Sequence, residues 1–179
     1  MSLKLSILFL LLLLYPTQIY QMNIQDLEKQ VNIKTIKTGE TWYGIKCTEG
    51  IWGYYVKGTN NIVICDDGKN YKIPVENSLE FKTNHELGHA LWYNGLNTKQ
   101  KTTYERLYKT SKSTNPFYRD YGKNNLDESF ADDFALGSMK IDRWDMAENA
   151  RKNYTQSVLK RTPINIFDFN KIPTSILQP

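Results

Sequence analysis

The chain has 179 residues, of which 40% are hydrophobic, and a formal net charge of +4 from 23 basic and 19 acidic side chains. This length is enough for one domain with its own hydrophobic core. Acidic and basic residues are interspersed and form no run of lysines or arginines, which excludes an electrostatic patch of the kind that binds nucleic acid or a membrane surface.

The first residues are typical of an export signal. Lys4 supplies a short basic start, and Leu5 to Leu14 form an apolar run. That run is about half of the ~20 residues that a membrane-spanning helix needs, so a signal peptide is favoured over an uncleaved anchor. We therefore expect a signal peptide over residues 1–21 and a secreted domain over residues 22–179, with no stable membrane span once the signal is removed.

Short segments after the signal predict one helix and a small sheet. Asn23 can cap a helix over Ile24 to Val31. Four aromatic and β-branched runs, separated by turn residues, predict strands: Trp42 to Cys47, Trp52 to Val56, Ile62 to Cys65 and Tyr71 to Ile73. We expect an antiparallel sheet in which Ile62 to Ile64 is a candidate edge for an added peptide strand.

Cys47 and Cys65 are the only cysteines. In an exported protein such a pair is usually a disulfide, which here would close a loop of fewer than about 20 residues and stabilise the fold by about 3 kcal/mol. A metal site is the alternative, but there is no CxxC spacing and no histidine near either cysteine in the sequence. A disulfide between Cys47 and Cys65 is therefore predicted.

From Glu76 onwards the pattern is helical. The predicted helices are Ser78 to Tyr93, Thr102 to Lys112, Leu126 to Met139 and Arg143 to Lys160. Asn94-Gly95 is a typical stop for the first, and Asn124 or Asn125 can cap the third. The chain has no internal repeat and no linker rich in Pro, Gly or Ser, so a single α+β domain is expected.

The first of these helices contains the H-E-x-x-H motif His85-Glu86-Leu87-Gly88-His89. Residues four apart share a helix face, so both imidazoles can bind one metal ion, and Glu86 lies where it can take a proton from a bound water. The motif also occurs in ordinary surface helices, but these are the only two histidines of the chain. Gly88 costs up to ~1 kcal/mol relative to alanine within a helix, so a close approach is expected there. The motif predicts one Zn²⁺ per chain.

A third ligand is required, because a catalytic zinc takes three protein ligands and leaves its fourth position to water. No third histidine exists, so the ligand must be a carboxylate. Glu128 is the best candidate, on a predicted helix whose apolar side can pack beside the first. Asp132, one turn further on, can accept the free N–H of a ligand histidine. Asp127 and Asp133 are expected to be solvated.

Residues 121–132, YGKNNLDESFAD, resemble the tyrosine-to-glutamate signature of the anthrax lethal factor catalytic domain and of the secreted clostridial Pro-Pro endopeptidases. In both families, as here, the signature follows an H-E-x-G-H helix after a few dozen residues. The resemblance is specific for Asn84 to Met139 and extends to the N-terminal sheet only in the order of elements. Aspartates stand at positions 132 and 133, where relatives often carry glutamate.

The resemblance implies a zincin-like fold, in which a small antiparallel sheet precedes a helical half that carries the H-E-x-x-H helix and the glutamate-ligand helix. It also implies the role of each site residue. The zinc ligands would be His85, His89 and Glu128. Glu86 would be the general base, and Tyr121 would stabilise the oxyanion.

These patterns predict a secreted, monomeric zinc endopeptidase that hydrolyses peptide bonds of extracellular proteins, with a zinc-bound water activated by Glu86. Its partner would be a protein or peptide, proline-rich by analogy with some relatives. One alternative is a zincin-like domain that binds zinc and a partner without proteolysis. Another is a metal-free fold stabilised by the disulfide, with ordinary histidines.

Overall fold

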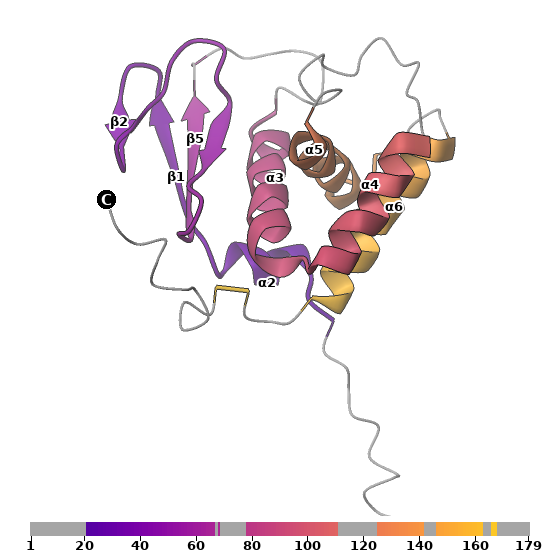
Figure 1. Cartoon of the computed structure of the whole chain (residues 1–179). Helices are drawn as coiled ribbons and strands as arrows, with labels where there is room; N and C mark the ends of the chain where they lie inside the picture. Colours follow the sequence, from indigo (N-terminus) through magenta and orange to yellow (C-terminus); the bar gives the residue numbers. More distant parts are fainter. Residues whose placement is uncertain are drawn as a thin grey trace, which may run out of the picture.

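The computed structural model describes residues 21–66, 68, 78–110, 125–141, 146–162 and 166–167. The signal segment and the strand predicted over Tyr71 to Ile73 lie outside this part of the chain. The described residues form a mixed α+β structure (Figure 1). Its elements are α2 (Ile24–Glu28), β1 (Asn32–Lys37), β2 (Thr41–Trp42), β3 (Ile45–Lys46), β4 (Gly53–Tyr55), β5 (Asn61–Asp66), α3 (Leu79–Ala90), η2 (Leu91–Gly95), α4 (Thr98–Thr110), α5 (Leu126–Ser138) and α6 (Met146–Arg161).

β5 is the central strand of a three-stranded sheet with the order β1-β5-β4. β1 runs parallel to β5, and β4 runs antiparallel to it with Tyr54 opposite Val63. The prediction of an antiparallel sheet is therefore wrong, because the sheet is mixed. The prediction that Ile62 to Ile64 form an edge is also wrong, because β5 has a neighbour on each side. Among the described residues, β4 is an edge strand.

The sequence of β5 reflects burial on both of its faces. Ile62 and Ile64 pack with Leu87 of α3 in the main core, whereas Val63 and Cys65 pack in a second cluster on the opposite face. All four β5 side chains are at most 1% exposed. A strand covered on both faces is a continuous apolar run instead of an alternating one. β1 gives no such signal, since only one of its six residues is buried, and the sequence pattern does not predict it.

The segment predicted as one strand over Trp42 to Cys47 is a hairpin. β2 and β3 pair through Thr41 with Lys46 and through Trp42 with Ile45. The two residues between them, Tyr43 and Gly44, have φ values of 53° and 76°. Positive φ at both positions of a two-residue turn is the type I′ hairpin geometry. Tyrosine is uncommon in this backbone region, so the sequence does not signal the turn.

A disulfide joins Cys47, which directly follows β3, to Cys65 in β5, as predicted. The two Cα atoms lie 5.5 Å apart, within the usual range for such a bond. Both cysteines are almost fully buried, and they pack in the second cluster together with the partly buried Ile51. The bond therefore anchors the segment that leads from the hairpin into β4.

α3 lies between the sheet and the other long helices, α4, α5 and α6 (Figure 1). Ser78 caps α3, since its hydroxyl accepts a hydrogen bond from the Phe81 N–H at 3.0 Å. The helix continues into the π-helical turn η2, which ends at Gly95, so the predicted stop at Asn94-Gly95 is confirmed.

Other helix boundaries differ from the prediction. α4 begins at Thr98 instead of Thr102, because Asn97 and Gln100 cap it reciprocally through two hydrogen bonds of 2.9 Å between side chain and backbone. α2 has the predicted cap at Asn23 but ends at Glu28. Asn125 stands at the cap position of α5 without a side-chain capping bond.

The prediction that Asp133 is solvated is also wrong. Asp133 is 1% exposed, as is Arg151 of α6, whose Nε donates to Asp133 Oδ2 at 2.8 Å. The Tyr104 hydroxyl of α4 donates to the same oxygen at 2.7 Å. The three side chains thus connect α4, α5 and α6, and α5 is the helix that carries Glu128.

Replacing Arg151 should destabilise the fold strongly. Arg151→Met removes the cation that faces a buried carboxylate, and breaking a buried pair by removing one partner costs about 3–5 kcal/mol. We expect the urea midpoint to fall accordingly. Arg161→Met is the matched control on the same helix. Arg161 is exposed and bonds only to Ser157 among the described contacts, so a change within about 0.5 kcal/mol is expected. Equal midpoints for the two variants would contradict a structural role for the buried pair.

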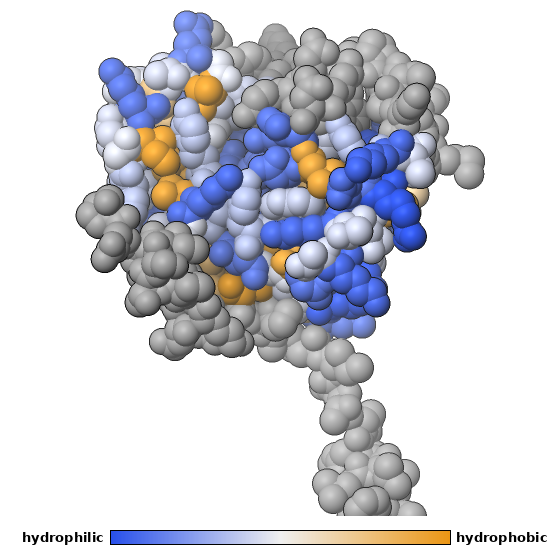
Figure 2. Space-filling model, viewed as in Figure 1, coloured by the Kyte–Doolittle hydropathy of each residue, from blue (hydrophilic) through white to orange (hydrophobic). Residues whose placement is uncertain are grey.

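The visible surface is largely hydrophilic. In Figure 2, apolar residues form separate small spots on the described part of this face, not one continuous patch. Among the described helices, none combines the length and apolar character needed to span a membrane.

Candidate metal centre

Gly88 allows α3 and α5 to approach closely. A Cβ atom placed at Gly88 would lie 2.7 Å from Ala131 Cα and 3.2 Å from Phe134 Cβ of α5. Real Cβ atoms do not come this close to a backbone atom, so only glycine fits. The close approach predicted for this glycine is therefore to the helix that bears Glu128, and it brings the facing side chains of α3 and α5 together.

Two imidazoles and one carboxylate meet at this contact. His85 Nε2 lies 3.1 Å from His89 Nε2 and 3.2 Å from Glu128 Oε2, and His89 Nε2 lies 3.4 Å from Glu128 Oε1. Bonds of about 2.0–2.1 Å in a tetrahedron separate ligand atoms by roughly 3.3 Å. The three donor groups therefore have the spacing of three ligands around one small ion, and they form a possible metal-binding site.

Asp132 supports this site from one side. His85 Nδ1 lies 2.8 Å from Asp132 Oδ1, as predicted for the carboxylate one turn after Glu128. The contact leaves His85 Nε2 directed at His89 and Glu128. A hydrogen bond of this kind to a ligand histidine fixes both its tautomer and its ring orientation.

The cluster of acidic and imidazole groups shifts the pKa of its members. Burial by itself lowers the pKa of His85, but hydrogen bonds to Asp132 and Glu128 and the negative charges of Asp132 and Glu86 outweigh it and raise that pKa to about 10. Burial raises the pKa of Glu128, but the hydrogen bonds and charges of the two imidazoles outweigh burial and hold its pKa well below the usual range. Glu128 is therefore ionised near neutral pH, as a metal ligand must be.

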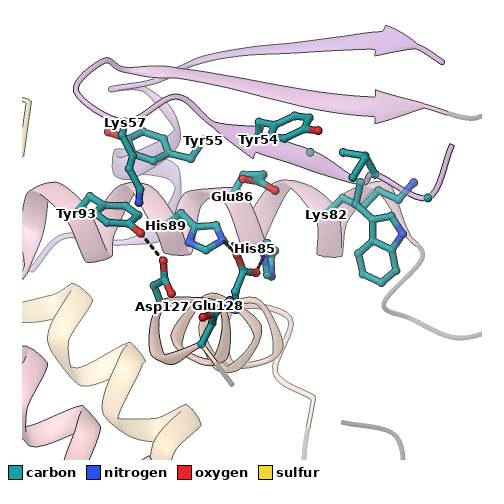
Figure 3. A pocket seen from close by; sticks show the side chains of 15 residues that line it. Tyr54, Tyr55, Lys57, Lys82, His85, Glu86, His89, Tyr93, Asp127 and Glu128 are labelled. Atoms are coloured by element: carbon teal, nitrogen blue, oxygen red, sulfur yellow. Dashed lines mark hydrogen bonds and ion pairs between the residues drawn. The ribbon is translucent and has the colours of Figure 1, made fainter. Parts of the chain in front are cut away.

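Glu86 lies between the imidazoles and β4 (Figure 3). Its side chain is buried, and a Cβ at Gly53 would come within 2.9 Å of Glu86 Oε1, so only glycine leaves room for this carboxylate. Burial raises the pKa of Glu86, and the two imidazoles and a hydrogen bond from the Tyr55 backbone oppose the rise. A carboxyl group with a raised pKa, held beside a metal site, is suited to accept and return a proton.

A pocket of about 550 Å³ opens beside these residues. β4 forms one wall, and α3 with the first turn of α5 forms the other (Figure 3). Lys57, Tyr93 and Asp127 lie towards one end of the pocket, and Lys82 lies towards the other. Trp52, Tyr54 and Tyr55 are among the lining residues. The pocket thus gives a ligand access to the site.

Sequence reasoning missed the pairing of Tyr93 with Asp127. Asp127 was expected to be solvated, but its Oδ2 accepts a hydrogen bond from the Tyr93 hydroxyl and it lines the pocket. The available signal was spacing, since Tyr93 follows His89 by one helical turn and so projects from the same side.

The structure brings together most of the predicted site residues. Those that converge are His85, Glu86, His89, Glu128 and Asp132. Tyr121, predicted to stabilise the oxyanion, lies outside the described residues. Comparison with known proteins gives no further assignment: no protein-family model matches the chain, and neither the curated proteins nor the solved structures searched gave a significant match.

Proposed function

We propose that the protein is a secreted zinc-dependent endopeptidase with a zincin-like arrangement of its two ligand helices. The observation that carries the proposal is the convergence of two imidazole nitrogens and a carboxylate within 3.1–3.4 Å of one another, with Glu86 beside them in an open pocket. Two histidines and one glutamate are a known ligand set of catalytic zinc in peptidases. Secretion is supported by the signal-like N-terminal segment and by the disulfide.

Glu86 acts as general base in this proposal. When bound, zinc supplies Lewis acidity and lowers the pKa of a coordinated water towards 7. The Glu86 carboxylate accepts the proton of the attacking water and passes it to the leaving amine as the peptide bond breaks. Contacts with Gly53 and the Tyr55 backbone keep this carboxylate oriented through both transfers. By the family resemblance, the Tyr121 hydroxyl donates to the tetrahedral oxyanion.

The edge of β4 is suited to hold an extended peptide. The Cys65 N–H donates to the Trp52 carbonyl, and the Val56 N–H donates to the Asn61 carbonyl, so the two residues that flank β4 direct these backbone groups at β5. In an antiparallel pair alternate residues turn their backbone groups away from the partner strand, which directs Gly53 and Tyr55 towards the pocket. The Tyr55 N–H bonds to Glu86, so a peptide would bond to Gly53 and the Tyr55 carbonyl. A peptide added as a strand here passes alongside Glu86 and the metal site.

Chelation should abolish peptide cleavage, and added zinc should restore it. Purified protein is incubated with a peptide library, cleavage sites are mapped by mass spectrometry, and metal content is measured on the same sample. We expect about one zinc per chain and cuts that disappear with chelator. Glu128→Gln should lose zinc and activity, whereas Glu105→Gln, a more exposed residue of α4, should retain both.

The outcomes separate the competing functions. Bound zinc without cleavage of any peptide would support the alternative of a zinc-binding domain that recognises a partner without proteolysis. Protein that binds no transition metal under any condition would contradict both zinc-dependent functions.

A further inference from the structure

The two histidines of the metal centre are oriented in different ways. His85 is held by the hydrogen bond from Nδ1 to Asp132. His89 is 8% exposed, and its Nδ1 is buried with no hydrogen-bond partner among the described residues. A ligand histidine usually has its second nitrogen bonded, because that bond fixes the ring. Within the part of the chain that the structure describes, the contact that orients the His89 ring is therefore a different one.

Tyr93 makes that contact. Its ring stacks on the His89 ring, with the centroids 6.3 Å apart and the planes inclined by 23°. Stacking holds the plane of the imidazole but leaves its nitrogens free, so it can orient Nε2 towards Glu128 without a bond to Nδ1. Figure 3 shows Tyr93 beside His89 on the same side of the helix.

Tyr93 is itself held on two sides. Its hydroxyl donates to Asp127 Oδ2, and Asp127 directly precedes the ligand Glu128 in the first turn of α5. Lys57 Nζ lies 4.1 Å from the centroid of the Tyr93 ring, in a cation–π contact. The Tyr93 ring is therefore tied both to the turn that carries Glu128 and to the segment that follows β4.

We infer that Tyr93 and Asp127 are positioning residues of the metal centre: the Tyr93 ring orients His89, and Asp127 links that ring to the helical turn that bears Glu128. The inference rests on the proposed metal binding but not on peptide hydrolysis. Tyr93 and Asp127 would thus orient His89 and Glu128 as Asp132 orients His85. Neither residue touches the reacting atoms in this role.

Zinc affinity tests the inference directly. Dissociation constants are measured by competition with a chromophoric chelator for the full chain and its variants. Residues that orient metal ligands typically contribute 10–100-fold to metal affinity. Tyr93→Leu, which removes the stack and the hydrogen bond, should weaken zinc binding by about that factor. Tyr93→Phe and Asp127→Asn, which keep the ring stacked, should each give a smaller loss of about 10-fold, at the lower end of that range.

Tyr43→Leu is the matched control, because Tyr43 is 59% exposed in the β2–β3 turn, away from the pocket lining. Its zinc affinity should equal that of the unmodified protein. Circular dichroism of the metal-free proteins checks that each variant is folded. If Tyr93→Leu proves unfolded, the isosteric Tyr93→Phe and Asp127→Asn carry the test alone.

The absorption spectrum of the Co²⁺-substituted protein supplies a second readout, since it reports ligand geometry, which a purely structural role of Tyr93 would not alter. We expect shifted bands for Tyr93→Leu and an unchanged spectrum for Tyr43→Leu. Zinc binding by the Tyr93 variants within twofold of the unmodified protein would overturn the inference and leave the proposed function standing. Absence of zinc binding by the unmodified protein would overturn both.

Discussion

Glu86→Gln should abolish peptide hydrolysis while zinc stays bound. The amide has the shape of the carboxylate and can still accept the hydrogen bond from the Tyr55 backbone, but it cannot take up a proton from water. General-base catalysis contributes typically 10²–10⁴-fold, so kcat/KM should fall by at least about that factor. The measurement is cleavage of a peptide substrate alongside the zinc content of the same protein.

Glu80→Gln is the control for this experiment. Glu80 lies in the first turn of the same helix but is exposed, so the identical chemical change is made without altering the pocket. It should retain full activity and full zinc content. Near-normal cleavage by Glu86→Gln would remove the assignment of the general base, and loss of zinc from that variant would show that Glu86 acts as a ligand instead.

Gly88→Ala should disrupt the metal centre through the packing of two helices. A methyl group at Gly88 would sit 2.7 Å from Ala131 Cα, and moving to a normal contact separates the backbones by on the order of 1 Å. Overpacking of this kind costs about 1–3 kcal/mol, which exceeds the gain of up to ~1 kcal/mol in helix propensity. Ligand distances must stay within about 0.2 Å of their ideal values, so zinc binding should also be lost.

Gly137→Ala provides the matched control on the facing helix. Its new methyl group would meet only the side chain of Gln156, which can move aside, instead of a backbone. The displaced Gln156 bonds are long, 3.3 and 3.4 Å, so their loss is offset by the improved helix propensity. Thermal unfolding and zinc titration of both variants test the difference. Equal behaviour of the two alanine variants would show that the contact between Gly88 and Ala131 is not what positions the ligands.

Part of the candidate metal site could be predicted because its two histidines are close together in the sequence. His85 and His89 are one helical turn apart, and a helix alone is enough to place them side by side. Glu128 required one more step, since its helix had to be recognised as the partner of the first. The cost of a glycine at position 88 indicated a close approach, and the structure identifies α5 as what approaches.

Parts of the sheet could not be predicted because they depend on contacts distant in sequence. β1 exposes five of its six residues, so it carries no apolar alternation, and it is a strand because β5 offers it a parallel partner. The hairpin turn at Tyr43 has a backbone conformation that tyrosine seldom adopts. The apolar run of β5 was recognised as a strand, but its central position follows from burial on both faces, which the run alone does not reveal.

The aspartates of α5 show a second limit of sequence reasoning. Asp127, Asp132 and Asp133 look alike in sequence, yet one bonds to Tyr93, one to His85 and one to Arg151. At about 100° per residue, positions 127, 132 and 133 lie on different sides of the helix, so each side chain meets a different neighbour. The role of Asp132 could be predicted because it lies one turn after Glu128, whereas the role of Asp133 depends on which helices pack on its side.

Cys47 and Cys65 can pair within a single chain in only one way, because the sequence contains no other cysteine. Oxidation of the reduced chain therefore cannot trap it in a scrambled isomer. The competing product is a covalent link between two molecules, and this bimolecular side reaction slows on dilution while closure of the ring does not. Formation of this bond thus requires an oxidant but no reshuffling of mismatched bridges within the chain.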